Sequence, residues 1–94
     1  MKYSVVISSS AKRTIKKLGR SGSFDPSNLH LMLRAFEEGA MLPAVFKDHR
    51  LHGRFSEYRE CHIGFDMLVV YKRNEEQEIV TISDIGTHPE IFGE

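Results

Sequence analysis

Hydrophobic and polar positions in the first part of the chain predict a short strand followed by a helix. Residues 3–7 form a mostly apolar run of strand length, which indicates a buried strand. Ala11, Ile15 and Leu18 then recur at helical spacing, after three serines whose hydroxyls can cap a helix N-terminus. Basic residues occupy the other faces of this helix, and Gly19 is expected to end it.

The next segment predicts a second helix, from Pro26 to the residues just before Gly39. Asp25 is a good N-cap, proline suits the first helical position, and Phe24 and Leu29 have the spacing of a hydrophobic staple. The apolar positions that repeat with the helical period are Leu29, Met32, Leu33 and Phe36. Two such amphipathic helices need a sheet to cover their apolar stripes.

The central stretch, residues 58–72, has the pattern of a β-hairpin. Residues 54–63 form its first strand, in which Glu60 and His62 point to the same side. The second strand begins at Met67 and is an almost continuous apolar run, as expected of a strand that is covered on both faces. A tight turn between the strands is expected to bring His62 and Asp66 together near solvent.

The remaining segments complete the predicted sheet. Residues 41–53 are polar and irregular, residues 78–85 form a further strand, and the last residues are expected to fold back over the sheet through Ile91 and Phe92. The predicted order is β-α-α-β-β-β, an α+β fold with both helices packed on one face of a mainly antiparallel sheet. The other face is left partly free, and a polar site is expected there.

Length and composition narrow the possible classes of protein. The 94 residues allow one small domain, residues 1–94. No apolar run approaches the roughly 20 residues that cross a bilayer, so we expect no membrane contact. The single cysteine, Cys61, excludes an internal disulfide and fits a reducing compartment; on the core side of its strand, it is expected to be an inert buried thiol.

Charge is distributed unevenly although the formal net charge is zero. Residues 1–34 contain seven basic residues and one acidic residue, a net +6, whereas residues 35–94 contain six basic and twelve acidic residues, a net −6. This asymmetry either gives the molecule a basic face for an anionic partner or is an ordinary solvated helix surface.

A small set of polar residues remains for chemistry: His49, His62, His88 and Asp66, with the cations Lys47, Arg50, Arg54 and Arg59. Imidazole titrates at about 6.5, so histidine exchanges protons readily near neutral pH. RNA carries its own nucleophile, the 2′-hydroxyl; its cleavage needs a base, an acid and positive charge around the phosphate. The histidines meet this requirement only if they converge; otherwise each is a surface or hydrogen-bonded structural residue, as we expect Arg59 to be.

A metal site is an alternative use of the same histidines. His49 and His52 lie three residues apart and could bind a metal together with His62 and His88. No cysteine pair, HExxH motif or phosphate-binding glycine loop accompanies them. We therefore expect no metal and no other cofactor.

Three segments, LPAVFKDHRLHG, YRECHIGFDMLVVYK and IGTHPEIFG, resemble in order and spacing the YafQ branch of the RelE superfamily, the toxins of bacterial type II toxin–antitoxin modules. The resemblance covers nearly the whole chain and includes the predicted order of elements. It implies a cytoplasmic, ribosome-dependent endoribonuclease that cleaves mRNA in the decoding site. It also implies a cognate antitoxin that wraps the toxin and blocks it.

The same resemblance assigns roles to individual residues. The catalytic set it implies is His49, His62, Asp66 and His88, and the expected substrate contacts are Lys47, Arg50, Arg54, Met67 and Phe92. We expect His88 to protonate the departing 5′-oxygen and Asp66 or His62 to take the 2′-hydroxyl proton, although acid and base can be exchanged. His49, with Arg50 or Arg54, would stabilise the charge on the phosphate.

Two departures from the family pattern bear on activity. Met67 stands where YafQ-like toxins can carry a tryptophan, which predicts a weaker base-stacking contact. The neutral net charge predicts a weaker or different contact with 16S rRNA than in basic relatives. The expected rRNA contacts are Lys12, Arg13, Lys16 and Lys17. The alternative is a catalytically silent protein of this fold that only binds an antitoxin or nucleic acid.

Overall fold

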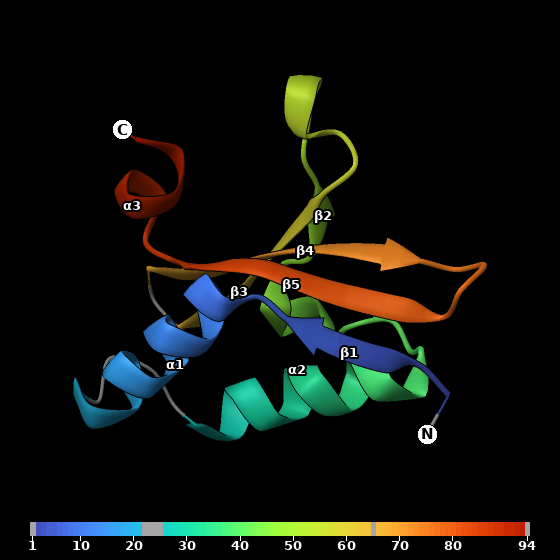
Figure 1. Cartoon of the computed structure of the whole chain (residues 1–94), viewed down its shortest axis with the longest axis horizontal. Coiled ribbons are helices and arrows are strands. Elements are labelled where there is room, and N and C mark those ends of the chain that lie inside the picture. Colours follow the sequence, from blue (N-terminus) through green and yellow to red (C-terminus); the bar gives the residue numbers. More distant parts are fainter. Residues whose placement is uncertain (1, 22–25, 65, 94) are drawn as a thin grey trace.

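The computed structural model describes residues 2–21, 26–64 and 66–93, and the chain forms one sheet with helices on both of its sides (Figure 1). The strands are β1 (Ser4–Ile7), β2 (His49–Arg50), β3 (Arg59–Gly64), β4 (Met67–Asn74) and β5 (Ile79–Gly86). The α-helices are α1 (Ser9–Ser21), α2 (Pro26–Glu38) and α3 (His88–Phe92), and two short 3₁₀ helices are η1 (Ala44–Phe46) and η2 (Gly53–Phe55).

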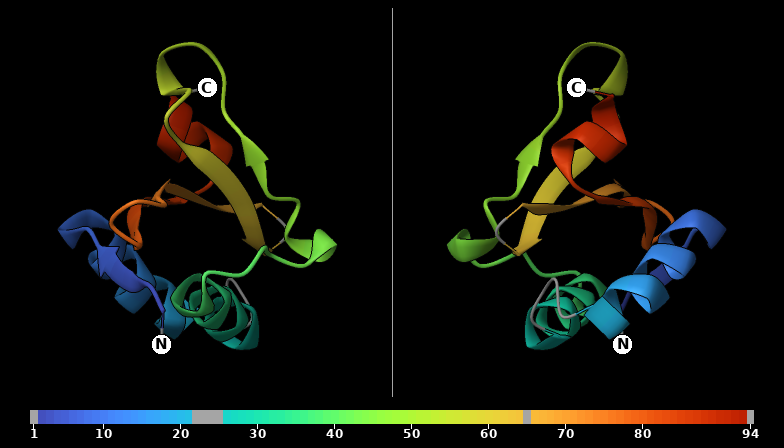
Figure 2. Two further views of the ribbon diagram at one scale, coloured as in Figure 1. Left: turned by 90° about the vertical axis from the view of Figure 1, so that its right-hand side faces the viewer. Right: turned by 90° about the vertical axis from the view of Figure 1, so that its left-hand side faces the viewer.

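The sheet has the order β1-β5-β4-β3-β2, and only the β1–β5 pair is parallel. This confirms the predicted α+β class and the mainly antiparallel sheet. The view in Figure 2 shows α1 and α2 together on one face, with α3 and η2 on the other. We call the face that carries α3 and η2 the open face.

The first strand is an edge strand, and this corrects the expectation that its apolar run is buried. Its residues alternate between exposed and half-buried, and half of the Val6 side chain surface is exposed. Within the part of the chain that the structure describes, the strand pairs with β5 alone and is covered on one face by the helices, so alternate side chains point to the open face. Val6 is one of these outward-facing residues.

Local capping explains the ends of the first two helices. The Ser8 hydroxyl accepts a hydrogen bond from the Ala11 amide at 3.0 Å, which confirms the predicted serine cap of α1. This helix continues through Gly19 to Ser21, so the predicted stop is wrong: an exposed glycine weakens a helix without ending it. The second helix ends before Gly39, as predicted, and Gly39 adopts the left-handed backbone conformation (φ +69°).

The core lies between the sheet and the two N-terminal helices. Its fully buried side chains include Met32 and Phe36 from α2, Cys61 from β3 and Val80 and Ile82 from β5. Phe36 packs on the ring of Tyr71 with ring centroids 4.5 Å apart. The amphipathic stripe of α2 therefore covers the middle of the sheet, as its sequence pattern predicts.

The central hairpin is shorter and the loop before it more ordered than its sequence indicates. The first hairpin strand begins at Arg59; Arg54 lies in η2 instead of the predicted strand. His49, predicted in a loop, lies in the two-residue strand β2, which adds a fifth strand to the predicted four. Such a short edge strand is defined by its pairing with β3, and local sequence gives no sign of that pairing.

The end of the chain folds back over the open face, as predicted, but as a helix. The α3 helix has a complete capping box between Thr87 and Glu90, with Pro89 in its first turn. Figure 2 shows α3 beside η2 above the sheet, and the rings of Phe55 and Phe92 meet edge to face at 5.9 Å. This contact closes one end of the open face.

Some predictions concern residues outside the described ranges: the cap at Asp25, the staple at Phe24 and the middle of the turn at Phe65. Among the residues that the structure describes, no helix has the length and apolar character needed to span a membrane.

Candidate active site

The centre of the candidate site is a buried carboxylate that lies against two histidines. Glu60 is 3% exposed, although it is charged and sits on the open face. Its Oε1 atom lies 3.6 Å from Nε2 of His49 and 3.5 Å from Nε2 of His62. Since buried carboxylates are rare unless they are paired, this arrangement indicates a specific role for the cluster of His49, Glu60 and His62.

Strand geometry places these three side chains on one face. His49 is the cross-strand partner of Glu60, so the two side chains point the same way. His62 follows Glu60 by two positions in β3 and therefore points to the same face. The short strand β2 thus delivers a histidine from a distant segment to the central hairpin.

A backbone turn orients the His49 ring. Its Nδ1 atom lies 2.9 Å from the carbonyl oxygen of Lys47, which can only accept, so Nδ1 carries the proton of this hydrogen bond. Lys47 holds that carbonyl in position because it caps η1 in the left-handed conformation, with φ +51°. The opposite nitrogen, Nε2, is thereby directed at Glu60.

Behind the cluster, Asp48 fixes the start of β2 to the sheet. Its carboxylate accepts two hydrogen bonds from the Nε and Nη2 atoms of Arg59, the shorter at 2.9 Å. It also accepts a hydrogen bond from the Tyr71 hydroxyl at 2.5 Å, and burial together with this carboxylate raises the pKa of Tyr71. Arg59 therefore has the predicted structural role, and the network anchors the residue next to His49.

The environment of His62 favours its neutral form. Burial lowers the pKa of His62, and the positive potential of Lys47, His49 and His88 lowers it further. The Glu60 carboxylate opposes this effect without cancelling it. A neutral imidazole at physiological pH can accept a proton, so His62 has the protonation state required of a general base.

His88 approaches from the C-terminal side. It begins α3, is exposed, and its ring lies 5.5 Å from that of Phe92. Phe92 in turn contacts Phe55, and the Arg54 guanidinium lies 5.0 Å from the Phe55 ring centroid. These residues form a cationic and aromatic group, and its His88 is near enough to His62 to contribute to the lowered pKa of that ring.

The structure does not bring all of the predicted site residues together. Asp66 is exposed in the β3–β4 turn, and the carboxylate that acts on the His62 pKa is that of Glu60. Met67 is 6% exposed and belongs to the hydrophobic core, which corrects the expectation of a surface contact. Arg50 follows His49 in β2, so strand alternation turns its side chain away from Glu60, and its Nε donates to the Ser56 carbonyl at 2.9 Å.

Sequence reasoning did not select Glu60 as a candidate residue, although a signal was present. The alternating strand placed Glu60 on the same side as His62, and a carboxylate between polar outward positions is easily taken for a solvated surface residue. Its importance depends on His49, which reaches it only through the β2–β3 pairing.

The predicted cationic surface is present on α1. The exposed basic residues along this helix are Lys12, Arg13, Lys16 and Lys17.

The lone cysteine is buried as predicted: burial raises the pKa of the Cys61 thiol, and its sulfur contacts that of Met32 at 3.6 Å. Among the described residues, no three histidine, cysteine or acidic side chains form a group suited to hold a metal ion.

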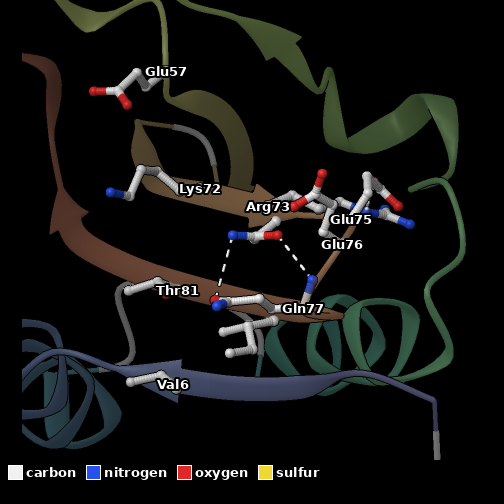
Figure 3. Close-up of a pocket in the computed structure, with 10 residues that line it drawn as sticks. Val6, Glu57, Lys72, Arg73, Glu75, Glu76, Gln77 and Thr81 are labelled. Atoms are coloured by element: carbon white, nitrogen blue, oxygen red, sulfur yellow. Dashed lines mark hydrogen bonds and ion pairs between the residues drawn. The ribbon is translucent and has the colours of Figure 1, made fainter.

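A large cavity is separate from the histidines. It has a volume of about 710 Å³ and lies at the β4–β5 hairpin, where Lys72, Thr81 and Val6 line it (Figure 3). The Asn74 amide donates to the Gln77 side-chain oxygen at 3.4 Å, and its own oxygen accepts from the Gln77 backbone N–H at 2.9 Å. None of the described residues that line it is a histidine, so this cavity is distinct from the cluster of His49, Glu60 and His62.

Proteins of known structure have the same fold and a similar sequence. A copper-bound mutant toxin from Helicobacter pylori superposes with a TM-score of 0.85 at 29% identity, over 96% of this chain and 99% of that one. The toxin of the Escherichia coli DinJ–YafQ toxin–antitoxin complex superposes with a TM-score of 0.82 at 26% identity, over 99% and 100% of the two chains.

Sequence comparison identifies the family. The mRNA interferase toxin YafQ of Escherichia coli K12 is 33% identical over 78 residues, which cover 82% of this chain and 83% of that protein. Residues 3–93 match the family described as the bacterial toxin of type II toxin–antitoxin systems, YafQ. The fold and sequence are those of a toxin from a type II toxin–antitoxin system, and this toxin is an endoribonuclease. Within this class, the chain belongs to the YafQ family.

Proposed function

We propose that this toxin is a ribosome-dependent endoribonuclease that cleaves mRNA by metal-independent acid–base transphosphorylation and so inhibits translation. The proposal is supported by the family and by one observation above all: a buried glutamate that lies against two histidines on the open face. Its surroundings supply proton acceptors, proton donors and cations without a metal.

In this reaction the 2′-hydroxyl of the RNA loses a proton and its oxygen attacks the adjacent phosphorus. The bond from phosphorus to the 5′-oxygen breaks, and that oxygen takes up a proton as it leaves. The products are a 2′,3′-cyclic phosphate and a 5′-hydroxyl end. No water or other reactant is consumed in this step.

The residues divide these tasks according to their surroundings. His62 accepts the 2′-hydroxyl proton, because its lowered pKa keeps it neutral. His88, exposed at the start of α3, donates a proton to the 5′-oxygen. His49 lies beside the phosphate with Lys47 and Arg54, while Glu60 orients both neighbouring imidazoles. This assignment replaces the predicted role of Asp66 with a positioning role for Glu60.

Dependence on the ribosome follows from the exposure of the site. His49 and His88 are exposed, so a free RNA is held in few of the required contacts. The ribosome would supply the alignment of the mRNA. A cognate antitoxin, as in the DinJ–YafQ complex of the Escherichia coli relative, would bind the toxin in the bacterial cytoplasm.

Cleavage of ribosome-bound mRNA by the purified toxin tests this proposal. Wild type is expected to cleave the bound message and to leave the same RNA nearly intact when ribosomes are omitted. His62→Ala is expected to lower the rate at least a hundredfold, since a general base contributes about 10²–10⁴-fold. His30→Ala, an exposed histidine on α2, is the matched control and should retain full activity.

Expression in bacteria separates an enzyme from a catalytically silent binding protein. A toxin arrests growth, and His88→Ala should relieve the arrest while still binding the antitoxin. If wild type and His88→Ala affect growth equally, the acid–base assignment fails.

A further inference from the structure

A second cavity lies directly beside His62, at the free edge of β3. The short strand β2 pairs only with Arg59 and Glu60, so the edge of β3 beyond these residues has no described strand next to it. Instead η1 and the first turn of α2 stand opposite that edge, and a cavity of about 400 Å³ remains between them. His62 belongs to both the cavity and the histidine–glutamate cluster.

The lining of this cavity is apolar on one side and polar on the other. Val45 in η1 is 76% exposed, an unusual exposure for a branched apolar side chain, and Phe46 and Ile63 beside it are buried. Lys47 adds a cation at the end of η1 nearest the cluster. An apolar wall with a cation beside it suits a nucleotide, whose base is flat and whose phosphate is charged.

Asn28 supplies the polar side. Its amide nitrogen donates to the carbonyl of Ile63 at 3.4 Å, which fixes the orientation of the amide group. An amide side chain also has an oxygen that accepts and a second N–H that donates, and within this cavity both groups are suited to a ligand with donors and acceptors. An amide in this position can recognise the edge of a nucleobase.

We infer that this cavity is a nucleobase subsite, which holds the base of the nucleotide next to the cleaved phosphodiester bond. Val45 packs against the plane of the base, Lys47 binds the neighbouring phosphate, and the Asn28 amide bonds to the base edge. The inference rests on the proposed function and adds to it a determinant of cleavage-site preference. The subsite and the catalytic cluster share His62, so seating the base also places its phosphate at the histidines.

Mapping of cleavage sites on ribosome-bound mRNA tests the role of Asn28. Asn28→Ala is expected to change the ratio between preferred and disfavoured bases at one position beside the cut by about threefold or more. Asn28→Asp, which offers only acceptors, should shift the preference toward bases with an exocyclic amino group and away from uracil. Asn74→Ala on the distant β4–β5 turn should leave the profile unchanged.

Filling the cavity gives a second, independent test. Val45→Trp is expected to lower cleavage of all messages at least tenfold, whereas Leu31→Trp, an exposed apolar position of α2, should have no effect. Unchanged base preference in both Asn28 variants, with an active Val45→Trp enzyme, would overturn the inference.

A binding measurement separates failure of the subsite from failure of the proposed function. The probe is a short RNA that carries 2′-O-methyl groups and cannot be cleaved, and the readout is the NMR signal of the Val45 methyl groups. A shift that is reduced in Asn28→Ala supports the subsite even if wild type cleaves no ribosome-bound mRNA. No shift of the Val45 signal at saturating RNA contradicts it, whatever the activity.

Discussion

At the scale of single residues, the candidate site is centred on a glutamate that lies against two histidines. A buried carboxylate costs free energy unless it is paired, and here its two neighbours are imidazoles, which can exchange protons near neutral pH. Sequence reasoning identified both histidines as candidates, but the carboxylate that it selected for the site was Asp66. The reason for this difference is physical: Asp66 is near His62 in sequence, whereas Glu60 meets His49 only through strand pairing.

The titration of His62 tests this electrostatic description. Its pKa should lie below the ordinary value of about 6.5, because burial disfavours the charged imidazolium. Glu60→Gln removes the charge that favours the imidazolium, so the pKa should fall further. Lys47→Met removes a charge that disfavours it, so the pKa should rise.

NMR of the imidazole carbon-bound protons in the free toxin measures these pKa values directly. The two substitutions act in opposite directions, which makes a general loss of structure easy to distinguish. A His62 pKa that is unchanged in both variants would contradict the proposed charge environment.

At the scale of elements, the two long helices and the apolar strands followed from hydrophobic periodicity, whereas the short elements did not. The pattern of α2 and its ending before Gly39 were predicted because the local sequence carries both signals. The two-residue strand β2 and the short helices η2 and α3 are too brief for any periodic pattern. These short elements nevertheless position His49, Phe55 and His88, so the site was less predictable than the fold.

A pair of glycine substitutions compares Gly39, which follows the end of α2, with Gly19, which lies inside α1. Gly39→Ala should lower the free energy of unfolding by at least about 1–2 kcal/mol, because a Cβ is disfavoured in the left-handed conformation. The added atom would also lie 2.5 Å from the Tyr3 ring. Gly19→Ala should instead stabilise by about 0.5–1 kcal/mol, since its Cβ meets nothing within 4 Å inside α1.

Urea denaturation of both variants and wild type provides the measurement. We expect opposite signs for the two changes in the free energy of unfolding, at similar m-values. Equal effects at the two positions would show that the role assigned to the Gly39 conformation is incorrect.

At the scale of the whole molecule, positive charge and chemistry occupy different parts of the fold. The basic N-terminal region supplies α1, and the more acidic remainder of the chain supplies the sheet with the histidine–glutamate cluster. The charge asymmetry was visible in the sequence, but its position relative to the site required the fold. This arrangement suits a protein that docks through one surface and cleaves at another.

Ribosome binding at different salt concentrations tests the predicted rRNA contacts of α1. Lys12→Glu combined with Lys16→Glu, which lie one turn apart on α1, should weaken binding and flatten its dependence on salt. The slope of log K against log salt should fall by about 0.7–0.9 for each lost phosphate contact. Lys2→Glu, an exposed cation outside α1, should leave binding unchanged; an equal effect of all these changes would indicate only a non-specific attraction.

The chemical nature of the RNA ends tests the proposed acid–base mechanism. Transphosphorylation by histidines leaves a 2′,3′-cyclic phosphate on one fragment and a 5′-hydroxyl on the other. Cleavage should also persist with a chelator that binds transition metals but spares the magnesium of the ribosome. Mass spectrometry of fragments from ribosome-bound mRNA should therefore show cyclic phosphate and 5′-hydroxyl ends in wild type and no fragments in His62→Ala. Fragments with 5′-phosphate ends, lost on chelation, would contradict the account.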